Sequence, residues 1–234
     1  MFITFEGIEG SGKTTQIKLF ADFLKEKNFN CLITKEPGGT ELGLKIREIL
    51  LNSKSEICSE SELFLFIADR IQHLKALIIP ALQQNKIVLC DRYFDSTIAY
   101  QKYARGLDLS ILNYLDFLKP DITFLLDLPV EHGLLRVSKR KDIKTRFEQE
   151  SIDFHNKVRL GYLEIAKINH ERFRIINALL KEEEVQGLIK KMFFEFLENK
   201  KMPRTRLELV QGYAPRDFKS LASTSSATQA FKIK

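Results

Sequence analysis

The sequence predicts one α/β domain built on a five-stranded parallel sheet with helices on both faces. Five short apolar runs recur along the chain, at residues 2–5, 31–34, 87–90, 122–126 and 173–176. Several of them are continuously apolar, which is typical of strands that are buried on both faces. The segments between them have helical periodicity, and strands that alternate with helices form parallel sheets.

The spacing of apolar residues locates the helices. After the first strand, Ile17, Phe20 and Leu24 recur at intervals that place them on one helix face. A second, longer helix carries such a stripe from Leu63 to Ile78, and residues 148–199 are expected to form two helices around the last strand. The chain has 234 residues, 44% of them hydrophobic, which is enough for one sizeable core.

The positive charge of the chain lies at its C-terminal end. The formal net charge is +6, and residues 200–234 carry all of this excess, so residues 1–199 are neutral overall. Basicity therefore gives little support for nucleic acid as a partner of the domain. We expect residues 1–199 to be the folded domain and residues 200–234 to be a disordered, basic and serine-rich tail. The tail is either an extension or translation beyond the ancestral end.

Cysteine usage and hydropathy predict a soluble cytoplasmic protein. Cys31, Cys58 and Cys90 are odd in number and widely spaced, which argues against a disulfide scaffold or a structural zinc site. No apolar run approaches the roughly 20 residues that span a bilayer. Glu6 interrupts the N-terminal apolar run before the core of a signal peptide could form. We therefore expect no partnership with a membrane.

The strongest functional motif lies between the first strand and the first helix. It matches G-x-x-x-x-G-K-[ST], in which glycines let backbone N–H groups surround phosphates. Here Lys13 can reach the β and γ phosphates of ATP and Thr14 can bind Mg²⁺, so we expect both cofactors. A glycine-rich turn without the Lys-Thr ending could be merely a tight loop. The expected ATP-binding residues are Gly7, Ile8, Glu9, Gly10, Ser11, Gly12, Lys13 and Thr14.

Absent motifs narrow the class of nucleotide enzyme. The chain has no D-x-x-G or N-K-x-D motif of a GTPase and no L-S-G-G-Q-like motif of a transport ATPase. Phosphoryl transfer to a small acceptor is favoured. Asp91 and Arg92 follow the third strand, at the sheet edge where α/β proteins bind ligands. Arg92 is suited to hold an acceptor phosphate, and Asp91 is a second candidate ligand for Mg²⁺. An internal ion pair between them is the alternative.

Residues 91–101, Asp-Arg-Tyr-Phe-Asp-Ser-Thr-Ile-Ala-Tyr-Gln, resemble the D-R-Y-x-x-S-T-x-A-Y-Q signature of thymidylate kinases. Residues 36–40, 64–70 and 148–164 agree with that family in order and spacing, and the similarity ends near Asn199. The resemblance implies the three-layer fold of P-loop kinases, with a small lid at about residues 136–147. It also implies transfer of the γ-phosphate of ATP to dTMP, giving dTDP and ADP in the synthesis of dTTP, by a homodimer.

The resemblance further implies roles for single residues. Phe66 would stack on thymine while Arg70 bonds a base carbonyl, and their i, i+4 spacing places both on one helix face. Phe66 could instead be a core residue. Arg92 would hold the acceptor phosphate, Tyr100 would lie beside the deoxyribose, and Glu9 would lie near the 3′-hydroxyl and a magnesium-bound water. The other residues expected at dTMP are Glu36, Pro37, Ser96, Thr97 and Gln101.

The catalytic cations are expected to be Lys13, Arg92 and an arginine of the lid. Enzymes of this fold place a transition-state cation in the phosphate loop or in the lid, and the loop position here is Gly10. Arg140 and Arg146 are the lid candidates. The choice between them stays open, because Lys141-Asp142 replaces the R-x-R-G-like string of bacterial lids. A solvated basic face is the alternative for this segment.

Two alternatives to a dTMP kinase remain at this point. The first is a kinase for another nucleoside monophosphate, and the second is a P-loop ATPase switch, which the absent switch motifs disfavour. A kinase that acts on dTMP or on another nucleoside monophosphate needs no general base, because the acceptor phosphate is already largely dianionic at neutral pH. The histidines have no metal or triad spacing, so we expect them to be structural.

Overall fold

The computed structural model describes residues 1–52, 56–140 and 145–199. The predicted tail, residues 200–234, and the middle of the predicted lid, residues 141–144, lie outside this range. Within the described residues, no helix has both the length and the hydropathy to cross a membrane.

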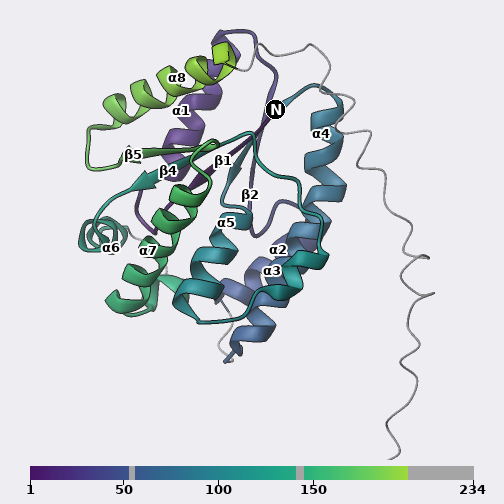
Figure 1. Cartoon of the computed structure of the whole chain (residues 1–234), viewed down its shortest axis with the longest axis vertical. Coiled ribbons are helices and arrows are strands. Elements are labelled where there is room, and N and C mark those ends of the chain that lie inside the picture. Colours follow the sequence, from purple (N-terminus) through teal and green to yellow (C-terminus); the bar gives the residue numbers. More distant parts are fainter. Residues whose placement is uncertain (53–55, 141–144, 200–234) are drawn as a thin grey trace, which may run out of the picture. The chain divides into compact units, whose positions relative to one another are not determined.

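A five-stranded sheet forms the centre of the domain (Figure 1). All strands are parallel and their order is β2-β3-β1-β4-β5, which confirms the predicted sheet. Each strand extends one residue beyond its predicted apolar run, and each added residue is polar. These polar ends share one edge of the sheet. The strands are β1 (Phe2–Glu6), β2 (Cys31–Lys35), β3 (Ile87–Asp91), β4 (Ile122–Asp127) and β5 (Phe173–Asn177).

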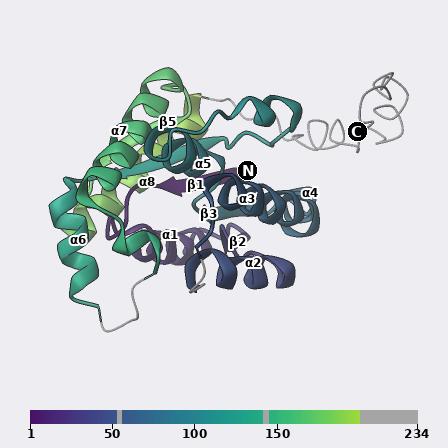
Figure 2. The same ribbon diagram turned by 90° about the horizontal axis from the view of Figure 1, so that it is seen from below.

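Helices cover both faces of the sheet, as predicted. Helices α1 (Lys13–Glu26) and α8 (Glu182–Asn199) pack together on one face, and α4 (Ile79–Gln83) and α7 (Ile152–Ile168) lie on the other. Figure 2 shows α1 on one side of the strands and α7 on the opposite side. The remaining helices are α2 (Glu41–Asn52), α3 (Ser59–His73), α5 (Phe94–Thr97) and α6 (Val130–Ser138), with short 3₁₀ turns η3 (Ser110–Tyr114) and η4 (Phe147–Gln149).

Alternation along the strands divides the core into two layers. Ile3 and Phe5 are fully buried in the larger cluster, where the ring of Phe5 lies 6.2 Å from that of Phe20 in α1 and 5.3 Å from that of Phe124. Phe2 and Val88 belong to the cluster on the opposite face. Successive side chains of a strand point to opposite faces, so one apolar run supplies both layers. Each such side chain contributes about 1.5–3 kcal/mol on burial.

The predicted long helix is confirmed but is interrupted. Helix α3 passes into a π-helical turn, η1 (Leu74–Ile78), before α4 begins. Pro80 stands in the first turn of α4. Proline has no N–H and its ring clashes with a carbonyl one turn earlier, so a continuous α-helix could not keep its hydrogen bonds here. Helix α5 likewise continues in a π-helical segment, η2 (Ile98–Ala104).

Candidate functional site

A cavity of about 420 Å³ opens at the carboxyl edge of the sheet. Its wall combines the phosphate loop, the ends of β2 and β3, one side of α3, and Arg140 and Thr145 from between α6 and η4. Two sets of residues that the sequence assigned to different ligands therefore share one space. The predicted site residues on this wall are Glu9, Gly10, Gly12, Lys13, Thr14, Glu36, Pro37, Phe66, Arg70, Asp91, Arg92, Ser96, Thr97, Tyr100, Gln101 and Arg140.

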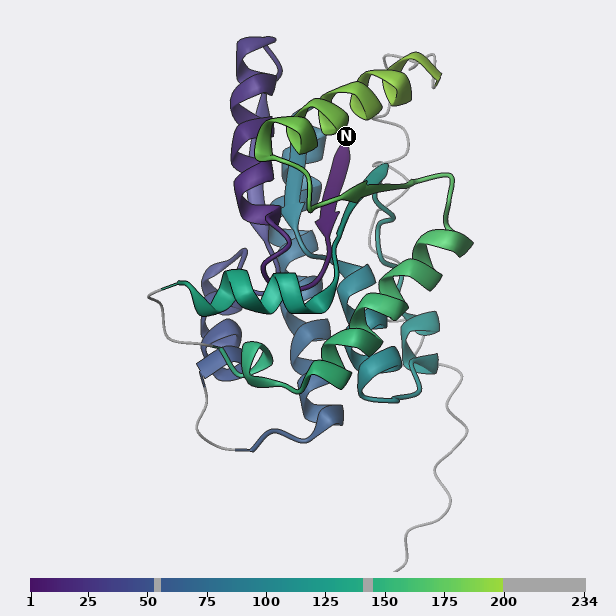
Figure 3. The ribbon, with the colours of Figure 1, turned by 90° about the vertical axis from the view of Figure 1, so that its left-hand side faces the viewer.

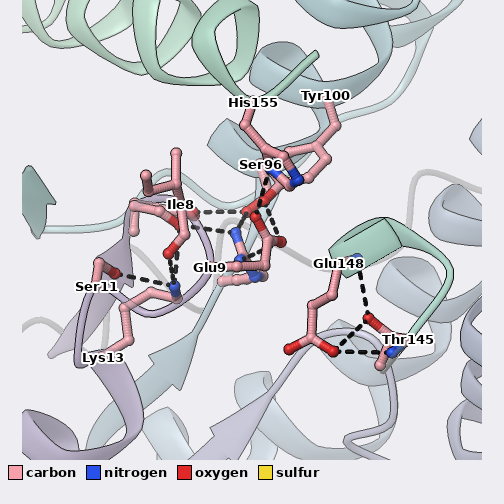
Figure 4. Close-up of polar contacts among 12 residues, drawn as sticks. Ile8, Glu9, Ser11, Lys13, Ser96, Tyr100, Thr145, Glu148 and His155 are labelled. Carbon is pink, nitrogen blue, oxygen red and sulfur yellow. Dashed lines mark hydrogen bonds and ion pairs between the residues drawn. The ribbon is translucent and has the colours of Figure 1, made fainter. Parts of the chain in front are cut away.

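The phosphate loop is folded around its own lysine. Lys13 Nζ donates to the carbonyl oxygens of Gly7, at 2.9 Å, and Ile8, at 2.8 Å, and to Ser11 Oγ at 3.2 Å (Figure 4). Burial, with a smaller contribution from the charge of Arg92, lowers the pKa of Lys13 to about 8. The ammonium group thus lies where the backbone N–H groups of the loop would bring phosphates.

Gly10 lacks a side chain for a steric reason. Its φ of 72° is in the left-handed region, and a Cβ there would lie 2.2 Å from the carbonyl oxygen of Gly133 in α6. Helix α6 therefore occupies the space that a cationic side chain at position 10 would need. The glycine from which the sequence analysis placed the catalytic cation in the lid thus has a packing reason.

Thr14 and Asp91 meet at the cavity wall. Thr14 Oγ1 donates to Asp91 Oδ2 at 2.7 Å. Mg²⁺ in phosphotransfer sites takes few protein ligands, all of them oxygen atoms, and completes its shell with water and phosphate oxygens. The described residues contain no cluster of three or more His, Cys, Asp or Glu residues suited to a metal. A hydroxyl beside a carboxylate fits a magnesium ion that is carried by the nucleotide.

Arg92 is bound to the phosphate loop. Its guanidinium group donates to the carbonyl oxygen of Gly7, to Tyr162 Oη and to Glu9 Oε1, each at 3.0 Å. Its backbone φ of 66° is left-handed, which is uncommon for arginine and turns the side chain back over the end of β1. The cation that was predicted to hold the acceptor phosphate is therefore paired with Glu9.

Glu9 lies in a dense group of polar side chains. Tyr100 Oη donates to Glu9 Oε1, and His155 Nδ1 lies 3.3 Å from Glu9 Oε2 (Figure 4). Burial raises the pKa of Glu9, but Arg92, the contact with His155 and the charge of Lys13 together lower it well below the usual range. Glu9 is thus an anion throughout the neutral range.

The acceptor side of the cavity is rigid. Arg70 is fully buried and donates to Glu36 Oε2 and Thr97 Oγ1, each at 2.8 Å, and to the carbonyl oxygen of Tyr93 at 3.1 Å. Phe66, one turn earlier on α3, contacts the main core and also lines the cavity. Phe66 is therefore partly a core residue, and one side of it is also exposed to the cavity, where a base was expected to stack.

The two lid arginines are placed differently. Arg140 lines the cavity, and its side chain is 51% exposed and lies 3.6 Å from Glu148 Oε1. Arg146 lies outside that wall, on a second hollow, where its guanidinium group donates to the buried carboxylate of Glu62 and to the carbonyl oxygen of Leu50. Within the described residues, Arg140 therefore has a partly exposed ion pair beside the cavity, whereas Arg146 is paired with a buried carboxylate.

The sequence did not indicate several residues of the wall. Arg47 of α2 lines the cavity and donates to the carbonyl oxygen of Pro37 at 2.8 Å. Lys35 is the polar end of β2, and Glu148 accepts from both the backbone N–H and the hydroxyl of Thr145 (Figure 4). Arg47 resembles any exposed residue of an amphipathic helix. Only the polar end of a strand could have singled out Lys35.

Glu6 lies beneath this wall and was interpreted only as a polar break in an apolar run. Its carboxylate accepts from the backbone N–H of Tyr93 at 2.8 Å, from Ser96 Oγ at 2.7 Å and from Tyr162 Oη at 3.0 Å. Burial, and then the neighbouring charge of Asp95, raises the pKa of Glu6 to about 7. Glu6 thus anchors the turn that carries Arg92.

Comparison with known proteins shows extensive similarity. The thymidylate kinase family model matches residues 5–189. The thymidylate kinase of Carboxydothermus hydrogenoformans is 50% identical over 194 residues, which cover 81% of this chain and 94% of that protein. The thymidylate kinase of Desulfosudis oleivorans is 48% identical over 199 residues, with 80% and 93% covered. A crystal structure of thymidylate kinase from Ehrlichia chaffeensis is 39% identical, with a TM-score of 0.67, and the match covers 82% of this chain and 97% of that one.

Proposed function

This chain belongs to the thymidylate kinase family and transfers phosphate from ATP to dTMP, and we propose here which of its residues perform the transfer. The predicted dTMP kinase activity is confirmed, and the two alternatives, a kinase for another monophosphate and an ATPase switch, give way to it. One observation carries the proposal. The phosphate loop and the residues expected to bind the acceptor line the same cavity.

ATP binds with its β and γ phosphates in the loop of residues 7–14. Lys13 then exchanges the carbonyl oxygens of Gly7 and Ile8 for phosphate oxygens. The acceptor dTMP lies with its base between Phe66 and Arg70 and its phosphate at Arg92. The two phosphates thereby face each other across the cavity. Catalysis consists of alignment and charge neutralisation, because the acceptor phosphate is its own nucleophile.

Arg92 changes partner when dTMP binds. Its charge is balanced by Glu9, 3.0 Å away. A dianionic phosphate is a stronger bidentate partner for a guanidinium group than one carboxylate oxygen is. The acceptor phosphate therefore takes Arg92, and Glu9 becomes available to the 3′-hydroxyl beside Tyr100. Ser96 and Thr97 complete the acceptor side, with Glu36 and Pro37 behind Arg70.

Arg140 is the lid cation of this proposal. It lines the cavity, and its ion pair with Glu148, within the described residues, is partly exposed, so moving toward a transferred phosphate costs little. Arg146 would first have to leave the buried carboxylate of Glu62. This contrast favours Arg140 over Arg146, a choice that the sequence left open.

Thr14 and Asp91 would hold Mg²⁺, which neutralises charge on the phosphate oxygens when it is bound. The hydroxyl and the carboxylate are already 2.7 Å apart, so little rearrangement is needed. We further propose that the enzyme is a cytoplasmic homodimer. The free thiols of Cys31, Cys58 and Cys90 suit a reducing compartment, and the exposed apolar side chains of α2 and α3 suit a subunit interface.

Replacing Arg92 tests the proposed acceptor site. We expect Arg92→Ala to lower turnover with dTMP on the order of 10²-fold, because one transition-state cation is lost. The affinity for ATP should change little, because the loop keeps Lys13. Steady-state ADP release and ATP titration measure the two effects. Arg174→Ala, an arginine of β5 outside the cavity wall, is the matched control and should turn over normally. Normal turnover of Arg92→Ala would remove Arg92 from the mechanism.

A further inference from the structure

We propose that Glu62, a buried carboxylate outside the cavity wall, sets the selectivity for the acceptor base by fixing the orientation of the Gln101 side-chain amide. This inference rests on the proposed binding of the base beside Phe66, Arg70 and Gln101. It assigns a positioning role to a residue for which the sequence indicated none.

Glu62 lies on α3, one turn before Phe66, and is fully buried. Its Oε1 accepts a hydrogen bond from Gln101 Nε2 at 2.8 Å. Its Oε2 accepts from Arg146 Nη2 and lies 3.3 Å from Arg105 Nη2. A buried carboxylate is costly unless cationic partners balance its charge, and here the guanidinium groups of Arg105 and Arg146 do so. These hydrogen bonds and ion pairs favour the charged form of Glu62.

The charge of Glu62 determines which way the amide of Gln101 points. A carboxylate only accepts hydrogen bonds, whereas a glutamine amide has one donating end and one accepting end. The donating end, Nε2, must therefore face Glu62. Gln101 also lines the cavity, so the end that remains for a ligand is the acceptor Oε1. Without Glu62 the amide could turn over and present N–H groups instead.

The orientation matters because pyrimidine bases differ in the atom at position 3. Thymine presents an N3–H donor beside a carbonyl oxygen, and cytosine presents an N3 acceptor beside an amino group. An acceptor at Gln101 next to the donors of Arg70 matches thymine and opposes cytosine at both positions. Arg70 has only donors and needs no orienting partner. Unlike Arg70, Gln101 could fit either base, because its side-chain amide has two possible orientations. Glu62 allows only the orientation that fits thymine.

The test compares dTMP with dCMP as acceptors. Glu62→Gln keeps the size of the side chain but allows an amide donor to face Gln101. We expect kcat/KM for dTMP to fall about tenfold or more, kcat/KM for dCMP to stay level or rise, and KM for ATP to stay unchanged. Glu62→Asp keeps the charge that Arg105 and Arg146 require and withdraws it from Gln101. Glu62→Asp should therefore also lower the ratio of kcat/KM for dTMP to kcat/KM for dCMP. This variant provides the test if Glu62→Gln folds poorly.

Two further variants separate the explanations. Glu150→Gln removes the other carboxylate bound to Arg105 without touching Gln101, so its dTMP-to-dCMP ratio should equal that of the unaltered enzyme. Equal losses for both acceptors in the Glu62 variants would show a structural role and overturn the inference. Gln101→Leu tests the premise. If it leaves the ratio unchanged, the proposed acceptor site is wrong; if it narrows the ratio while both Glu62 variants do not, only the role of Glu62 is wrong.

Discussion

The surroundings of Lys13 lower the pKa of its ammonium group in a way that a bound phosphate would reverse. Its ammonium group is bound to two carbonyl oxygens and a hydroxyl, none of which carries a full charge. Burial under these conditions lowers its pKa to about 8. Phosphate oxygens would supply the missing negative charge. Binding of ATP should therefore raise the pKa of Lys13 and favour its charged form.

We predict that the affinity for ATP falls as the pH rises above about 8. Below that pH the free enzyme already holds a charged Lys13, so binding needs no proton. Above it Lys13 is neutral and must take up a proton on binding, which raises Kd by up to tenfold for each pH unit. The phosphates of ATP are ionised throughout this window, because their last pKa lies near 6. Calorimetric titration between pH 7 and 9.5 measures Kd, and a constant Kd would contradict the prediction.

At the scale of elements, helix α6 and the phosphate loop pack closely, with the backbone of Gly133 against the backbone of Glu9 and Gly10. A Cβ on Gly133 would lie 2.5 Å from the carbonyl oxygen of Glu9. Figure 3 shows α6 running across the carboxyl end of β1, next to the start of α1. The first helix after β4 thus supports the loop after β1, although the two are far apart in the sequence.

We predict that Gly133→Ala separates α6 from the phosphate loop. The added methyl group has no space, so the free energy of unfolding should fall by about 1–3 kcal/mol. ATP should bind on the order of tenfold more weakly, because Glu9 and its loop must shift. Thermal unfolding and ATP titration measure these effects.

Gly187→Ala is the matched control for this experiment. Gly187 lies within α8, and a Cβ there would meet no atom within 4 Å. Alanine should therefore stabilise the protein by about 0.5–1 kcal/mol through helix propensity, with ATP affinity unchanged. Similar behaviour of the two variants would contradict the role given to the contact between α6 and the loop.

At the scale of the whole molecule, α2 and α3 carry several exposed apolar side chains. Leu44 is 55% exposed and Phe64 is 56% exposed, on two helices that pack against each other. Leu42 and Ile49 add to this surface on α2. Exposed apolar surface of this kind marks protein interfaces. It is continuous with helices whose opposite sides line the cavity, so an interface here would brace the acceptor site.

We predict that Phe64→Glu converts a homodimer into monomers, because a charge would be buried without a partner. Light scattering after size-exclusion chromatography measures the mass of the particle. Ile168→Glu, at an exposed residue near the end of α7, is the control and should leave the mass unchanged. A monomeric unaltered enzyme, or equal masses for all three proteins, would rule out this interface.

Local patterns were sufficient for much of this protein. The five strands were predicted because both faces of a parallel sheet are buried, which leaves continuous apolar runs, and the phosphate loop was predicted because its chemistry requires glycines and a lysine in a set order. The π-helical turns were not predicted, since the apolar stripe continues through them while Pro80 changes the hydrogen bonds. Asp91 was predicted at the end of the third strand, but Lys35 at the end of β2 was missed, because a single polar residue after an apolar run is a weak signal.

The sequence by itself determined the sheet, the nucleotide-binding loop and the family to which the chain is similar. Only the tertiary structure decided that Arg92 is paired with Glu9, that Arg146 is paired with Glu62, and that Gln101 donates to Glu62. The physical reason is separation along the chain. Periodicity and motifs report on neighbouring residues, whereas Arg92 and Glu9 are 83 positions apart and Gln101 and Glu62 are 39 apart. Such partners are chosen by how the helices and strands pack.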